Sequence, residues 1–115
     1  MDIQIKKGLI DTCVLAVLNK GDSYGYQIAK DISSVMVLSE TTLYPVLKRL
    51  MAAEYIKSYE VVHNGRLRKY FSIQLGGKEK LKGFESEQKA LLAVYDFIFK
   101  SIHADSAHNK EVLPS

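Results

Sequence analysis

The chain lacks much of what several classes of protein depend on. Its 115 residues include one cysteine, two prolines and no tryptophan. A single cysteine excludes an internal disulfide framework. Cys13 lies in the apolar run CVLAVL, which favours a small buried side chain over a reactive thiol. The absence of tryptophan excludes a ligand site built on indole rings, and so few prolines exclude a proline-rich segment.

Membrane and export signals are also missing. No apolar stretch approaches the roughly 18 residues that a membrane-spanning helix needs. No apolar region follows the lysines of the N-terminal MDIQIKKG, as it would in a signal peptide. We therefore expect a cytoplasmic protein.

Catalytic and metal-binding patterns are scarce. The serines have no partnered base, and there is no glycine loop of the Walker or Rossmann type. The histidines, His63, His103 and His108, lie at an expected hairpin tip and in a polar tail, where we interpret them as solvated. The sequence predicts no enzyme, no cofactor and no metal site.

The chain has an ordinary apolar content and a charge that is unevenly distributed along it. The chain is 47% hydrophobic and 25% charged, which is typical of a globular domain. Residues 1–75 hold 10 Lys and Arg against 7 Asp and Glu, whereas residues 76–115 hold 6 of each. The whole net charge of +3 thus lies in the first part, which favours an anion-binding region beside a region with another role.

Apolar periodicity predicts three helices in the first part. The first runs from Ile3 to Lys20 and stops before Gly21; the second runs from Tyr24 to about Ser33, with Asp22 or Ser23 as its N-cap. The connection SSVMVLS contains Val35 to Leu38, a brief strand or an extended linker.

The third helix is predicted from Ser39, its N-cap, to about Ala53. Its inward residues are Leu43, Val46, Leu47 and Leu50. Pro45 removes the hydrogen bond to the Thr41 carbonyl, so we expect a bend in the helix and not a break.

A hairpin and a long helix follow. Strands are predicted at Tyr55 to Val62 and Arg68 to Leu75, around an Asn64-Gly65 turn. The expected cross-strand pairs are Ile56 with Ile73, Tyr59 with Tyr70, Glu60 with Lys69 and Val62 with Leu67. The last helix is expected from about Lys78 to Ile102, apolar on more than one face, with a flexible polar tail from His103 onward.

This order of elements predicts a mainly helical winged helix-turn-helix with a long C-terminal helix. In that architecture the third helix enters the major groove of DNA and the hairpin contacts the backbone or the minor groove. Thr41, Tyr44, Pro45 and Lys48 share one outward face, flanked by Arg49, and the hairpin tip carries Arg66, Arg68 and Lys69. Two alternatives stay open: a basic tip that is merely solvated, and a Tyr44 ring packed half-buried on the wing.

Three stretches resemble the PadR family of bacterial transcriptional regulators. They are SYGYQIAKDI, TTLYPVLKRL and RKYFSI, the last followed by Gly77, and the resemblance covers roughly Lys7 to Leu81. The single C-terminal helix resembles the smaller PadR subgroup. At LGGKEK the chain departs from the family, which usually has a threonine cap there, so the resemblance does not fix where the last helix starts.

The resemblance implies a dimeric repressor that binds a palindromic operator. Residues 1–75 would bind DNA, residues 76–102 would form the dimerisation helix and residues 103–115 a flexible tail. The implied DNA contacts are Tyr24, Tyr26, Thr41, Thr42, Tyr44, Lys48, Arg66, Arg68 and Lys69. The implied dimer interface comprises Leu9, Leu81, Phe84, Leu91, Tyr95, Ile98 and Ile102.

The family often responds to small aromatic molecules. Phe84, Tyr95, Phe97 and Phe99 are candidates to line an aromatic cavity between subunits. We favour the simpler interpretation, in which these rings belong to the core and the interface. The rival functions are a winged-helix module that binds protein without DNA and a MarR-like regulator. The sequence does not distinguish repressor from activator.

Overall fold

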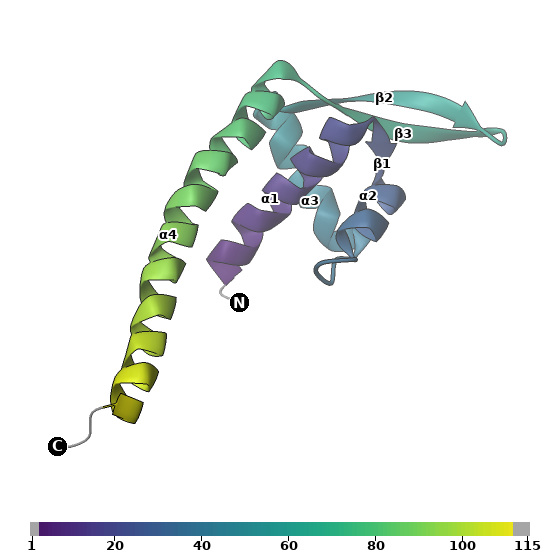
Figure 1. The fold of residues 1–115 in the computed structure, drawn as a ribbon. Coiled ribbons are helices and arrows are strands. Elements are labelled where there is room, and N and C mark those ends of the chain that lie inside the picture. Colours follow the sequence, from purple (N-terminus) through teal and green to yellow (C-terminus); the bar gives the residue numbers. More distant parts are fainter. Residues whose placement is uncertain (1–2, 112–115) are drawn as a thin grey trace. The chain divides into compact units, whose positions relative to one another are not determined.

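The computed structural model describes residues 3–111 (Figure 1). Its elements, in order, are α1 (Ile3–Lys20), β1 (Ser23–Tyr24), α2 (Gly25–Ile32), α3 (Glu40–Ala52), β2 (Ile56–His63), β3 (Arg66–Ile73) and α4 (Leu75–Glu111). The expected fold class, mainly helical with a small hairpin, is confirmed. The chain divides into two compact units, the first ending at Lys82 and the second beginning at Gly83. None of the helices within 3–111 is long and apolar enough to cross a membrane.

The core of the first unit is built from the predicted helical stripes. Its buried residues are Ile10, Val14, Leu15 and Leu18 of α1; Ile28, Ala29 and Ile32 of α2; Leu38; Leu43, Val46, Leu47 and Leu50 of α3; and Ile56 and Phe71 of the sheet. Cys13 lies half-buried beside this cluster, and burial raises the pKa of its thiol. It behaves as the small apolar residue that the sequence indicates.

The start of α2 differs from the prediction. Ser23 and Tyr24 form the short strand β1, paired with Phe71 and Tyr70 of β3. Ser23 is buried in this ladder, and Tyr24 is the N-cap without any side-chain cap bond. The expected cap at Asp22 or Ser23 was therefore wrong, because Asp22 precedes the added strand and Ser23 belongs to it. Val35 to Leu38 form a loop and no strand.

Helix α3 begins as predicted. The Ser39 hydroxyl oxygen accepts a hydrogen bond from the Thr42 backbone N–H at 3.2 Å, and Glu40 lies in the first turn. The helix continues through Pro45 to Ala52, so the proline does not break it. The bend at Pro45 stays a prediction.

The hairpin has the predicted register. All four expected pairs are confirmed, and Asn64 and Gly65 form a two-residue turn with φ angles of 51° and 77°. Both residues have left-handed backbone conformations, as a type I′ turn requires. The sheet order is β1-β3-β2, and Figure 1 shows β2 and β3 extending as a narrow ribbon beyond the first three helices.

Helix α4 exceeds its predicted limits at both ends. It starts at Leu75, because the Lys78 N–H donates to the Gln74 carbonyl at 3.0 Å and Gly76 and Gly77 therefore lie inside the helix. It continues past Ile102 to Glu111, through residues with no glycine or proline to stop it. The remainder of the expected tail, residues 112–115, lies outside the described residues.

Candidate nucleic-acid interface

The outward face of α3 presents the predicted polar residues. Thr41, Thr42, Tyr44 and Lys48 are all exposed. Tyr44 has 51% of its surface accessible, and the Lys48 ammonium lies 5.2 Å from the centroid of its ring. A cation and a phenol are thus offered together from adjacent turns, and this exposure disfavours the interpretation of Tyr44 as a half-buried ring. The Thr42 hydroxyl lies 3.0 Å from that of Ser39 and takes part in the cap.

Arg49 is held away from this face. Its guanidinium donates to both carboxylate oxygens of Asp11 on α1, at 2.5 and 3.4 Å. The pair joins α3 to α1 across a sequence separation that no local pattern reveals. Arg49 therefore links α3 to α1 through this ion pair, although the sequence analysis predicted that it flanks the DNA-facing residues.

Strand alternation divides the basic residues of the wing between two faces. Arg66 and Arg68 point to one face of β3, and Lys69 points to the other. The Lys69 ammonium lies 5.8 Å from the centroid of Phe71, and its cross-strand partner is Glu60. All three cations can therefore contact one partner only if that partner lies along the edge of the wing, where side chains from both faces can reach it.

Three tyrosines form a row across the sheet on the Arg68 face. Tyr70 lies between Tyr24 and Tyr59, with centroid separations of 5.3 and 5.9 Å. The guanidinium carbon of Arg68 lies 4.1 Å from the Tyr24 centroid. At the other end, the Tyr59 hydroxyl donates to an Asp22 carboxylate oxygen at 2.6 Å, which raises the pKa of Tyr59.

The sequence indicated only part of this row. Pairing of Tyr59 with Tyr70 followed from the hairpin register. The position of Tyr24 was missed because β1 has two residues, too few for any periodic signal.

An open groove of about 520 Å³ lies between the wing and the start of α2 and α3. It is lined by Tyr24, Gly25, Tyr26, Glu40, Leu67, Arg68 and Lys69. Tyr26 is 56% exposed and carries its phenol at this surface. The groove brings residues of both helices beside two cations of the wing, although they are far apart in the chain.

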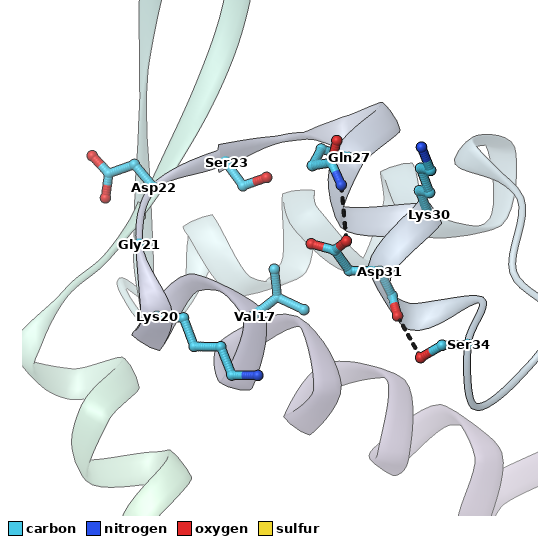
Figure 2. A pocket seen from close by; sticks show the side chains of 9 residues that line it. All are labelled: Val17, Lys20, Gly21, Asp22, Ser23, Gln27, Lys30, Asp31 and Ser34. Carbon is cyan, nitrogen blue, oxygen red and sulfur yellow. Dashed lines mark hydrogen bonds between the residues drawn. The ribbon is translucent and has the colours of Figure 1, made fainter.

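A second depression, of about 710 Å³, lies where α1 ends and α2 begins (Figure 2). It has two lysines, Lys20 and Lys30, and two aspartates, Asp22 and Asp31. The Gln27 side-chain amide donates to an Asp31 carboxylate oxygen at 2.8 Å. Figure 2 draws this bond as a dashed line, so part of the polar lining is already satisfied within the chain. Its mixed charge does not favour a nucleic acid.

The aromatic residues considered for an effector cavity are mostly exposed. Tyr95, Phe97 and Phe99 are 57%, 77% and 60% accessible, and Phe84 is half-buried. The two depressions described above are lined by other residues. Within 3–111 no group of three or more His, Cys, Asp or Glu side chains could hold a metal ion.

The second unit has a large apolar surface. Its exposed large apolar residues are Leu91, Leu92, Val94, Tyr95, Phe97, Ile98, Phe99 and Ile102. Ion pairs one turn apart, Lys89 with Glu85 and Lys100 with Asp96, mark its polar side. An apolar surface of this extent on a helix is typical of an interaction site.

Comparisons with known proteins agree with this arrangement. The model of the transcriptional regulator PadR-like family matches residues 14–83. An uncharacterised protein from Lysinibacillus sphaericus is 31% identical over 103 residues, covering 85% of this chain and 94% of the relative.

Solved structures show the same fold. A PadR family transcription regulator from Clostridium difficile is 33% identical, with a TM-score of 0.72 over 78% of this chain and 97% of its own. A transcriptional regulator from Clostridium thermocellum is 34% identical, with a TM-score of 0.73 over 84% of this chain and 95% of its own. Bacillus subtilis PadR in complex with operator DNA is 21% identical, with a TM-score of 0.62 over 66% of this chain and 46% of its own, which shows a shared fold.

Proposed function

The chain belongs to the PadR-like family of transcriptional regulators, and on this basis we propose that it is a homodimeric repressor of a palindromic operator. As a member of that family it is a DNA-binding regulator and not an enzyme. The observation that carries the proposal is the groove that joins the wing cations Arg68 and Lys69 to the first turn of α3. The Bacillus subtilis relative was solved on operator DNA, which supports the same role here. A regulator of this kind acts in the cytoplasm, where bacterial DNA lies.

The duplex contacts follow from exposure and chemistry. Thr41, Thr42, Tyr44 and Lys48 enter the major groove, where hydroxyl, phenol and ammonium groups reach base edges and phosphates. Arg66, Arg68 and Lys69 neutralise backbone phosphates from the edge of the wing. Of the two remaining candidates, Tyr26 offers its exposed phenol to the phosphate backbone, whereas Tyr24 is half-buried with its ring against the Arg68 guanidinium.

The apolar surface of α4 is the proposed dimer interface. Leu91, Tyr95, Ile98 and Ile102 are 48–61% exposed, and a second copy of the chain would bury them. Leu9, Leu81 and Phe84 are half-buried and complete the set. Leu81 already packs against the core of its own chain, so it would serve both surfaces. The DNA-binding region is residues 1–75 and the dimerisation helix residues 76–102, as the resemblance implies.

A small aromatic effector would enter between the two copies. Phe84, Tyr95, Phe97 and Phe99 offer flat apolar rings to such a molecule. The competing role of these rings, as plain interface, predicts that aromatic compounds leave operator affinity unchanged. Titration of the bound operator with small planar compounds distinguishes the two roles.

Selection of DNA from random sequence with the purified protein tests the function. We expect enrichment of a palindrome that also occurs near the gene of the regulator. No enrichment at low salt would exclude the regulator role and leave a protein-binding winged helix as the better interpretation.

Charge reversal tests the wing. Arg66→Glu with Arg68→Glu should weaken operator binding and make its salt dependence shallower, by about 1 in log–log slope for each phosphate that the wing no longer neutralises. Lys57→Glu is the control, since this exposed lysine lies on β2 away from the hairpin tip. The double change alters the net charge by twice as much as the control, so an effect no more than twice that of Lys57→Glu would mean that the wing acts only through net charge.

A further inference from the structure

Two arginines of the wing point to the same face but differ in how freely their side chains can move. Arg66, beside the turn, is exposed. Arg68 is half-buried, with its guanidinium carbon 4.1 Å from the centroid of Tyr24, which is half-buried as well. A guanidinium above an aromatic face at this distance is attracted by the ring quadrupole and restricted in its rotamers.

The ring beneath Arg68 is itself held in place. Tyr24 packs on Tyr70, and Tyr70 packs on Tyr59. The Tyr59 hydroxyl in turn donates a hydrogen bond to Asp22. Asp22 directly precedes β1, so the row is anchored at both ends near β1 and ties the wing to the start of α2. The support therefore comes from the body of the first unit and not from the wing alone.

We propose, building on the DNA-binding function above, that Tyr24 is a positioning residue that holds Arg68 ready for a phosphate of the operator. The ring of Tyr24 fixes the guanidinium before DNA arrives, so less side-chain freedom is lost on binding. The hydroxyl of Tyr24 has no part in this role. Tyr26, exposed in the same groove, is the residue of the pair whose phenol remains free for DNA.

The proposal makes the effect of Tyr24 depend on Arg68. Tyr24→Leu should weaken operator binding about fivefold, the scale of immobilising one long side chain on binding. Tyr24→Phe, which keeps the ring, should bind as the unchanged protein does. Arg68→Lys keeps the charge but loses the planar stack, so it should also bind more weakly and should respond less to Tyr24→Leu.

A double-mutant cycle measures this dependence by operator titration. Tyr24→Leu should have no further effect in an Arg68→Ala background and its full effect in an Arg66→Ala background. Tyr26→Leu is the control, with the same effect whether or not Arg68 is present. Equal losses of affinity from Tyr24→Leu in both arginine backgrounds, or a loss with Tyr24→Phe, would overturn the proposal.

Thermal unfolding distinguishes positioning from folding. If Tyr24→Leu unfolds the domain, Arg68→Lys and Tyr24→Phe are compared as single variants: Arg68→Lys binding as tightly as the unchanged protein, or a loss of affinity with Tyr24→Phe, overturns the proposal. Absence of operator binding by the unchanged protein would instead refute the DNA-binding function itself, on which this role rests.

Discussion

The Cα of Gly77 lies against the backbone carbonyl of Tyr55. A Cβ on Gly77 would collide with that oxygen and would lie 2.8 Å from the Ile73 side chain. The same carbonyl accepts a hydrogen bond from the Gln74 N–H at 2.8 Å, so it cannot move away freely. The end of the hairpin and the first turn of α4 therefore meet at one point that only glycine fits.

Replacing Gly77 should be costly, and replacing its neighbour should not. We expect Gly77→Ala to lower the free energy of unfolding by about 1–3 kcal/mol, because the methyl group forces the backbone apart. At Gly76 the nearest atoms to an added Cβ are 3.5 Å away, an ordinary contact. Gly76→Ala should be neutral or stabilising by up to about 1 kcal/mol, since alanine favours the helix. Urea unfolding of both variants checks this, and equal stabilities would contradict it.

The cap of α3 can be separated from its DNA contacts. Ser39→Ala should cost about 1 kcal/mol in urea unfolding, because the Thr42 N–H loses its partner. Ser39→Asp caps equally well and should keep the stability. Its carboxylate would lie next to the proposed phosphates, so operator affinity should fall. A Ser39→Asp variant that binds DNA unchanged would place the first turn of α3 away from the duplex.

The end of α3 contains a correctable strain. Glu54 has φ of 63°, and the N–H groups of Glu54 and Tyr55 donate to Met51 and Leu50, a Schellman motif with glutamate where glycine is usual. Glu54→Gly should raise the free energy of unfolding by about 1 kcal/mol. Glu54→Ala retains the Cβ and should give no such gain, so matching denaturant midpoints for the two variants would argue against strain at this residue.

The interface proposal for α4 predicts a change of oligomeric state. Leu91→Asp with Ile98→Asp should give monomers in sedimentation equilibrium, because two charges would be buried in an apolar contact. Operator affinity should fall on the order of a hundredfold as the two half-sites are no longer engaged together. Lys89→Gln with Lys100→Gln makes the same change in net charge on the polar side and serves as the control. A dimer that survives the first pair of changes would locate the interface elsewhere.

The sequence predicted elements whose cause is local. The stripe Leu43, Val46, Leu47 and Leu50 is buried because helix period alone selects one face, and the Asn64-Gly65 turn fixes the hairpin register. The cap at Ser39 follows from one side chain and one nearby N–H.

The features that were missed depend on contacts distant in sequence. Strand β1 exists because β3 offers it an edge, and Arg49 is occupied because Asp11 lies beside it in the fold. The stack of Arg68 on Tyr24 needs both the hairpin and β1. The predicted start of α4 was too late because paired glycines usually interrupt a helix. Gly77 nevertheless lies inside α4, since any side chain there would collide with the Tyr55 carbonyl.

Pro45 remains the feature of α3 whose role is least expected from helix propensity. It lies on the exposed side of an uninterrupted helix, and its missing N–H leaves the Thr41 carbonyl without its helical partner. We expect Pro45→Ala to raise the free energy of unfolding by about 1–3 kcal/mol and to lower operator affinity, because the first turn would lose the bend that directs Thr41 and Tyr44. Lys48→Ala, the control, should lower affinity without this gain in stability. A more stable Pro45→Ala variant with full operator affinity would show that the bend has no part in recognition, and an unchanged stability would show that Pro45 carries no energetic cost in this helix.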